Sequence, residues 1–147
     1  MGGHPYWYTV DYQEDVGAAL EALRTREFRA GRYNPVTPFP DFPIGPSSPA
    51  PGAGHASIED ALEASEADGT RSILDISVIS DEPDFGASCE LTTEELQSLF
   101  GTTFPTVEQL QNCGDFWESL ERGQARHVLV QGDEGKRLVF FAGYSFD

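Results

Sequence analysis

The chain has 147 residues, of which 39% are hydrophobic, 12% aromatic and 23% charged. This composition excludes wholesale disorder and fibrous classes, and the length predicts a single domain over residues 1–147 with its own core. No apolar run approaches the roughly 20 residues of a membrane span, and the first residues lack the basic and apolar regions of a signal peptide. Two cysteines, Cys89 and Cys113, are too few for a disulfide scaffold, so we expect a soluble, cytoplasmic protein.

Charge is concentrated in the middle of the chain. The 25 acidic and 9 basic residues give a net charge of −16, and residues 57–121 hold 16 of the acids with one basic residue, Arg71. Because phosphate contacts require clustered Lys and Arg, this charge argues against nucleic acid and against an anionic membrane as ligands. A field of this sign attracts a basic protein partner; the alternative interpretation is that the acids serve solubility alone.

The first elements in chain order are a strand and a helix. Residues 4–12 are rich in aromatic and β-branched side chains, with Tyr6 and Tyr8 on one face, which predicts a strand. Residues 13–30 carry an apolar stripe at helical spacing, with acids in the first turn and arginines toward the end. Gly31 then predicts the end of this helix.

Residues 34–56 predict a long loop, because seven prolines and several glycines leave no room for a helix or an interior strand. Its first half is apolar, and we expect Phe39 and Phe42 to seal the edge of the core. The alternative is that these two aromatic side chains anchor a partner. The second half has little to bury and is expected to be mobile.

The segment 57–123 predicts several short helices and one strand. Residues 72–79 are apolar and β-branched and predict the strand, and residues 81–86 predict an acidic turn. Helix starts are indicated by capping residues and two capping boxes. These capping residues are Ser57, Thr92, Thr106 and Asp115.

The chain ends in a predicted β-hairpin, with strands at 125–130 and 137–142 joined by a turn at 132–136. These elements together predict an α+β fold, with a mostly antiparallel sheet of about four strands and helices packed on one face.

Sequence motifs for catalysis and metal binding are not found. The three histidines form no His-x-x-x-His pattern, the two cysteines are not spaced as Cys-x-x-Cys, and no phosphate-binding glycine loop occurs. One lysine, Lys136, lies in the hairpin turn, which disfavours Schiff-base chemistry. We therefore expect no metal, no cofactor and no catalytic residue.

One basic cluster runs along the predicted first helix. Its members are Arg24, Arg26, Arg29 and Arg32. The simpler interpretation is that these arginines pair with acids inside the protein or with the helix dipole. The alternative is a small enzyme or a small-molecule sensor, whose site lies between the loop 34–56 and the sheet and uses Arg32, Tyr33 and His55.

Parts of the chain resemble uncharacterised bacterial proteins of this size. The similar stretches are residues 6–8 (YWY), 27–35 (EFRAGRYNP) and 140–147 (FFAGYSFD). This resemblance implies no activity. In size, acidity and low cysteine content the chain also resembles the immunity proteins of bacterial toxin systems, which implies a non-catalytic inhibitor that covers a basic toxin.

The leading hypothesis is therefore a non-catalytic acidic binding protein, in concrete form an immunity-type inhibitor of a basic toxin or nuclease. Its carboxylates would mimic phosphate and occlude a cationic cleft. The acids expected to contact the partner are Glu59, Glu63, Glu66, Asp81, Glu82, Asp84, Glu94 and Glu95.

Overall fold

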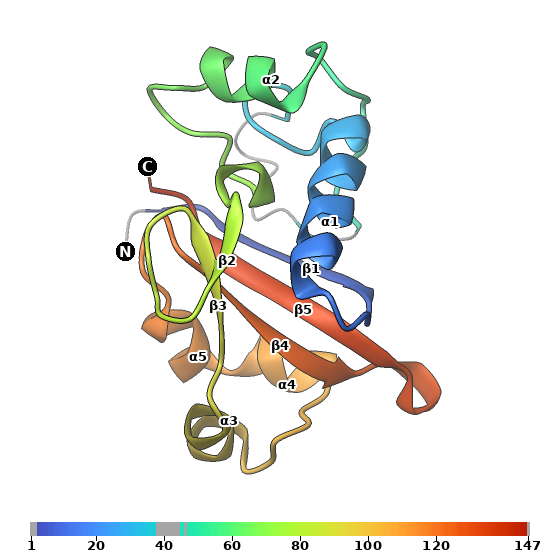
Figure 1. Cartoon of the computed structure of the whole chain (residues 1–147), viewed down its shortest axis with the longest axis vertical. Helices are drawn as coiled ribbons and strands as arrows, with labels where there is room; N and C mark the ends of the chain where they lie inside the picture. Colours follow the sequence, from blue (N-terminus) through green and yellow to red (C-terminus); the bar gives the residue numbers. More distant parts are fainter. Residues whose placement is uncertain (1–2, 38–44, 46, 147) are drawn as a thin grey trace.

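A computed structural model describes residues 3–37, 45 and 47–146, and a five-stranded mixed sheet runs through it (Figure 1). The strand order is β1-β5-β4-β3-β2. The α+β class predicted from the sequence is confirmed. The sheet, however, has five strands rather than about four, and it is mixed rather than mostly antiparallel.

The sheet has an antiparallel half and a parallel half. β5 (Arg137–Tyr144) pairs antiparallel with both β1 (Pro5–Asp11) and β4 (Ala125–Gln131), and the second pair is the predicted hairpin. β3 (Ala87–Glu90) lies parallel to β4, and β2 (Val78–Ser80) lies parallel to β3 at the border. The parallel half was missed because β3 is short and shows no alternating pattern.

The predicted strand at 72–79 is wrong over most of its length. Residues Ile73–Asp75 form a single 3₁₀ turn, η1, and the strand begins at Val78. The Ser72 hydroxyl accepts a hydrogen bond from the backbone N–H of Leu74, so a local side-chain contact bends the chain out of the extended form. Ile73, Leu74 and Ile76 are fully buried around this turn.

Helices pack on both faces of the sheet, which corrects the prediction of one covered face (Figure 1). Along β5, Val139 and Phe141 face α1 (Val16–Ala30), because alternate side chains point to opposite faces. Phe140 and Ala142 face the other layer. That layer is formed by α3 (Thr93–Phe100), α4 (Val107–Asn112) and α5 (Gly114–Ser119).

Most helix ends follow local chemistry that the sequence predicts. α1 ends at Gly31 as predicted, in the left-handed conformation, but it starts at Val16 rather than at residue 13, because Asp15 lies before the helix as its cap and its carboxylate accepts from the N–H of Ala18. Both capping boxes, at Thr92 and Thr106, are confirmed with both of their hydrogen bonds. Asp115 was expected to cap α5 but lies inside its first turn, and no side chain caps that helix.

The remaining short elements lie at the ends of the molecule. α2 (Ile58–Ala64) follows the Ser57 cap, and η2 (Asp133–Gly135) forms the turn between β4 and β5. None of the helices in the described ranges has the length and hydropathy that a bilayer crossing requires.

A buried polar pair joins the two parallel strands at the centre of the sheet. The Oγ of Ser88 on β3 lies 2.8 Å from Nδ1 of His127 on β4, and the two side chains are almost fully buried. Burial and the nearby Arg126 guanidinium lower the pKa of His127 from 6.5 to about 4. His127 is therefore a neutral packing residue at physiological pH.

This histidine makes folding stability pH-dependent. Since the pKa of His127 is lower in the folded state than in the unfolded state, protonation below pH 6.5 favours unfolding, and stability is lost as the pH falls toward 4. We expect the free energy of unfolding to fall by about 1 kcal/mol between about pH 7.5 and 5.5. His127→Asn, which keeps a group near the Nδ1 position, should remove this slope in urea titrations. An unchanged slope in the variant would contradict the assignment.

Candidate functional site

The eight predicted contact acids do not form one surface. They fall into three groups, on and just after α2, on the acidic turn between β2 and β3 (residues 81–86), and on α3. Figure 1 shows α2 and α3 toward opposite ends of the long axis of the molecule, with the acidic turn between them. The groups are Glu59, Glu63 and Glu66; Asp81, Glu82 and Asp84; and Glu94 and Glu95.

The α3 group includes a carboxylate with an internal role. Glu95 accepts hydrogen bonds at 2.7 and 3.2 Å from the guanidinium of Arg126, and its carboxylate also caps the start of α3. The Arg126 hydrogen bonds lower the pKa of Glu95. This acid therefore holds α3 against β4, and Glu94 beside it is exposed.

The acidic turn is an ordered structure with its carboxylates in solvent. Asp81, Glu82 and Asp84 are all exposed. The Ser80 hydroxyl donates to the carbonyl of Glu82 at 2.6 Å, and the Asp84 carboxylate accepts from the N–H of Phe85 at 2.8 Å. Local hydrogen bonds thus fix the backbone of the turn before any partner arrives.

Two large hydrophobic side chains are exposed beside these acids. Phe85 at the end of the turn is 64% exposed and Val78 on β2 is 54% exposed; all other large hydrophobic side chains in the described ranges are more covered. Phe85 is held in place, because its ring lies 5.7 Å from that of Phe146 and a Cβ at Gly123 would collide with it. The turn therefore presents an aromatic face next to three carboxylates.

A hollow of about 230 Å³ lies against the same turn. It separates Pro83 of the turn from the segment that follows α5, and Glu121 and the buried Arg126 line it. A second hollow on the other side of that segment is lined by Glu118 and Glu121. The lining of the first hollow is Pro83, Ser119, Leu120, Glu121, Gln124 and Arg126.

Glu118 and Glu121 are site residues that the sequence analysis missed. Glu121 is far from the turn in sequence and comes next to it because the N–H of Gly86 donates to the carbonyl of Gly123 at 2.7 Å, and Glu118 lines the second hollow. The acid count of the middle segment included both residues, but no local pattern connects them to residues 81–86. The acidic surface is therefore built from two separate stretches of chain.

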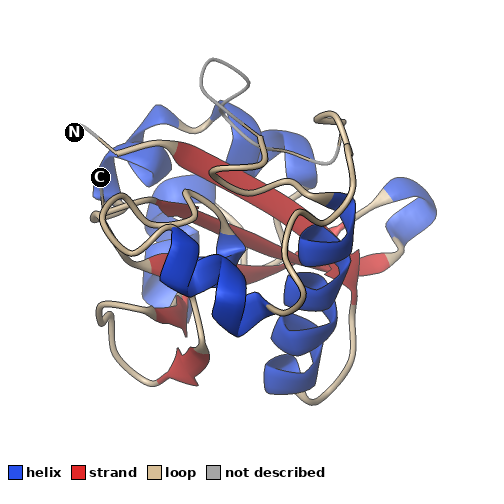
Figure 2. Ribbon diagram, turned by 90° about the horizontal axis from the view of Figure 1, so that it is seen from above, coloured by secondary structure: helices blue, strands red, loops and turns tan. Residues whose placement is uncertain are grey.

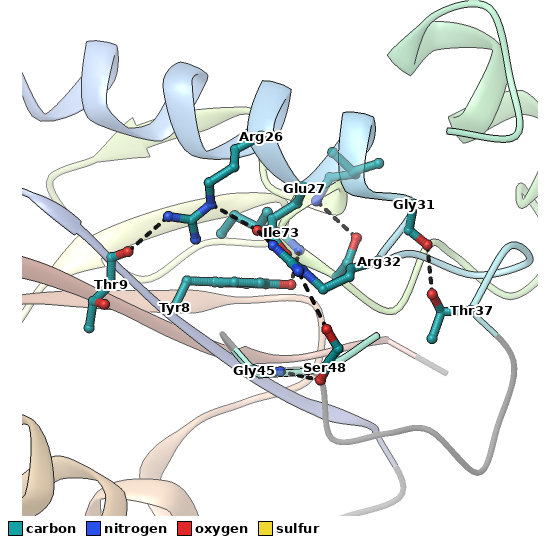
Figure 3. Close-up of polar contacts among 12 residues, drawn as sticks. Tyr8, Thr9, Arg26, Glu27, Gly31, Arg32, Thr37, Gly45, Ser48 and Ile73 are labelled. Atoms are coloured by element: carbon teal, nitrogen blue, oxygen red, sulfur yellow. Dashed lines mark hydrogen bonds and ion pairs between the residues drawn. The ribbon is translucent and has the colours of Figure 1, made fainter. Parts of the chain in front are cut away.

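The alternative ligand site is occupied by the protein's own side chains. Glu27 on α1 is fully buried, and Arg32 binds it with two hydrogen bonds of 2.7 and 2.9 Å (Figure 3). Arg26 donates to the same carboxylate at 2.9 Å and to the carbonyl of Thr9 on β1 at 3.1 Å. The Glu27 hydrogen bonds raise the pKa of Arg32. Arg26 and Arg32 of the cluster thus pair internally, with an acid of α1.

Tyr33 and His55 contact each other rather than an open site. The Tyr33 hydroxyl lies 2.8 Å from Nδ1 of His55 and accepts from the N–H of Gly54 at 3.2 Å. Tyr33 is fully buried, and its ring stacks on Phe28. These contacts fasten the end of the loop 34–56 to the end of α1.

Phe39 and Phe42, which were expected to seal the edge of the core or to anchor a partner, lie outside the described residues. Within the described ranges, no group of three or more His, Cys, Asp or Glu side chains is arranged to hold a metal ion. Cys89 is buried and Cys113 half-buried, and both are free thiols.

No family model, curated protein or solved structure matches the chain. The resemblance to immunity proteins therefore stays a prediction, and function has to be argued from the residues. The arrangement at the acidic turn combines a fixed backbone, exposed carboxylates and an exposed aromatic ring.

The buried ion pair at Glu27 gives a test of the structural role of the arginine cluster. Glu27→Gln leaves Arg32 with no buried carboxylate, and we expect a loss of about 3 kcal/mol in the free energy of unfolding. Glu21→Gln is the matched control, because the Glu21 side chain is 59% exposed and its contact with Arg24 is worth a few tenths of a kcal/mol. Urea denaturation measures both. Equal stabilities of the two variants would contradict the structural role.

Proposed function

We propose that the protein is a non-catalytic binding protein that docks a basic protein partner on the acidic turn. The observation that carries this proposal is the exposed Phe85 ring held beside the carboxylates of Asp81, Glu82 and Asp84. Exposed aromatic side chains in fixed positions are the residues that most often dominate protein–protein binding energy.

The order of the turn supports the proposal energetically. Association costs free energy when loops and side chains must be immobilised, and a preorganised surface avoids much of that cost. The hydrogen bonds of Ser80 and Asp84 and the packing of Phe85 on Phe146 supply this preorganisation.

The negative net charge of the protein favours a positively charged partner. With a net charge of −16, the protein attracts basic surfaces over several ångströms and repels acidic ones. Glu118 and Glu121 add carboxylates around the hollows next to the turn. The resulting field raises the association rate of a cationic partner and makes it sensitive to salt.

In its concrete form the proposal is an immunity-type inhibitor of a basic toxin or nuclease. The acidic turn would cover a cationic cleft, with carboxylates in the place of substrate phosphates. The small enzyme or sensor remains the alternative, but no observation favours it, since Arg32, Tyr33 and His55 are bound to other groups of the chain.

Charge reversal tests which acids contact the partner. Asp81→Lys, Glu82→Lys and Asp84→Lys together should abolish capture of a basic partner from the native host at physiological salt. Glu59→Lys, Glu63→Lys and Glu66→Lys, on and just after α2, are the matched control with the same change of charge, and we expect them to retain most of the binding. A wash at about 0.5 M salt should release the partner from the wild type.

Binding constants measured on the isolated partner complete this test. Equal weakening by both triple variants would indicate general attraction without a site, and full binding by the turn variant would overturn the docking surface.

Truncation of the aromatic ring tests the apolar part of the surface. Phe85→Ala should weaken binding by about 10- to 100-fold, because exposed aromatic anchors contribute roughly 1–3 kcal/mol to such interfaces. The dependence of the dissociation constant on salt should stay as in the wild type, since no charge is removed. Calorimetric titration at two salt concentrations measures both quantities; an unchanged affinity would remove Phe85 from the interface.

A further inference from the structure

At the end of β1, an aspartate and the aromatic residue after it contact two consecutive basic residues of the chain itself. The Asp11 carboxylate lies 2.9 Å from Nζ of Lys136, and the guanidinium carbon of Arg137 lies 4.5 Å from the centre of the Tyr12 ring. The negative face of an aromatic ring attracts a guanidinium, and a neighbouring carboxylate adds to that attraction. The molecule thus contains one aspartate–aromatic pair that binds cationic side chains.

The acidic turn ends in a second pair of this kind, Asp84 and Phe85. The Asp84 carboxylate accepts from the N–H of Phe85 at 2.8 Å, so it lies at the base of the aromatic side chain. The ring packs on Phe146 and Gly123, yet Phe85 remains 64% exposed. Figure 2 shows the loop that joins the two short strands, β2 and β3, at the margin of the molecule, where a partner can reach it. Among the described residues, no ion pair or cation–ring contact involves Asp84 or Phe85.

The chemistry of this second pair selects a guanidinium group. An uncharged apolar side chain placed on Phe85 would partly desolvate the Asp84 carboxylate without supplying a counter-charge. An ammonium group compensates the charge, but it is compact and strongly hydrated. A guanidinium is planar and more weakly hydrated, so it can stack on the ring while its edge donates N–H groups to the carboxylate.

We propose that Asp84 and Phe85 receive an arginine side chain of the basic partner, whose guanidinium stacks on the ring and donates to the carboxylate. This inference rests on the proposed function and names the side chain that the same surface recognises. Asp81 and Glu82 are exposed in the same turn and strengthen the attraction for any cation. The ring of Phe85 adds the preference for arginine over lysine.

The test uses three synthetic peptides, acetyl-Lys-Gly-Xaa-Gly-Lys-amide with arginine, lysine or citrulline at Xaa. Arginine and lysine give the same charge, and citrulline keeps the shape of arginine without its charge. We expect the arginine peptide to bind the full chain about two- to fivefold more tightly than the lysine peptide, and the citrulline peptide to bind most weakly. NMR titration measures the dissociation constants, and stacking on the ring should move the δ-methylene protons of the arginine upfield.

Variants at the pair test each part of the contact. Phe85→Leu keeps an apolar side chain but removes the aromatic face, so it should abolish the preference for arginine over lysine, and Phe85→Tyr, which keeps the ring, should retain it. Asp84→Asn should weaken binding of the arginine peptide by about two- to fivefold. Asp60→Asn, at an exposed aspartate of α2, is the matched control for the lost charge and should leave the affinity nearly unchanged. NMR spectra without peptide establish that each variant is folded.

The outcomes separate the arginine contact from the proposed function. Equal binding of the arginine and lysine peptides overturns the arginine contact, as does failure of the arginine peptide to bind or an arginine preference that persists in Phe85→Leu. A citrulline peptide that binds as tightly as the arginine peptide would overturn the cationic occupant, and equal weakening by Asp84→Asn and Asp60→Asn would indicate general attraction instead. In each case the charge-reversal capture experiment decides the proposed function independently.

Discussion

The proposed docking surface depends on one constraint of chain geometry, the parallel return from β2 to β3 within residues 81–86. Parallel neighbours usually need a dozen or more connecting residues. The short return is feasible here because β2 has three residues, a length of about 10 Å, so the turn has little distance to recover. A turn this short does not reach into the core, and its polar side chains therefore remain in solvent. The exposure of the acids, the position of Phe85 and the adjacent hollow all follow from this return.

Internal ion pairs neutralise part of the charge, and the acidic turn takes no part in them. Several arginines are committed internally, Arg26 and Arg32 to Glu27 and Arg126 to Glu95. Those guanidinium groups are therefore not available to screen the acidic turn. Exposed carboxylates at the surface therefore carry the excess negative charge that gives the net charge of −16. The arginine cluster, which in the sequence suggested an anion site, instead anchors α1 to β1 and to the loop that follows the helix.

The sequence predicts those features that local chemistry decides. Thr92 and Thr106 mark their helix starts because each cap is made by residues within three positions. The β4–β5 hairpin is predicted for the same reason. The parallel pairing of β3 and the approach of Glu121 to Pro83 depend on contacts between distant segments, and no local pattern encodes them. The site was therefore predictable in its acids at residues 81–84, and not in the aromatic face and hollow that accompany them.

The position of β5 sets the order in which the sheet can form during synthesis. β5 lies between β1 and β4, and Pro5 pairs with Tyr144. β1, the first strand of this sheet in chain order, therefore pairs with β5, the last strand in chain order. Until β5 is made, the alternating tyrosines of β1 have no neighbouring strand in the sheet, although α1 can already form from local contacts. The exposed nascent strand is aromatic and β-branched, the type of segment that associates with other chains. Completion of this sheet is consequently a late event that follows release of β5 from the ribosome.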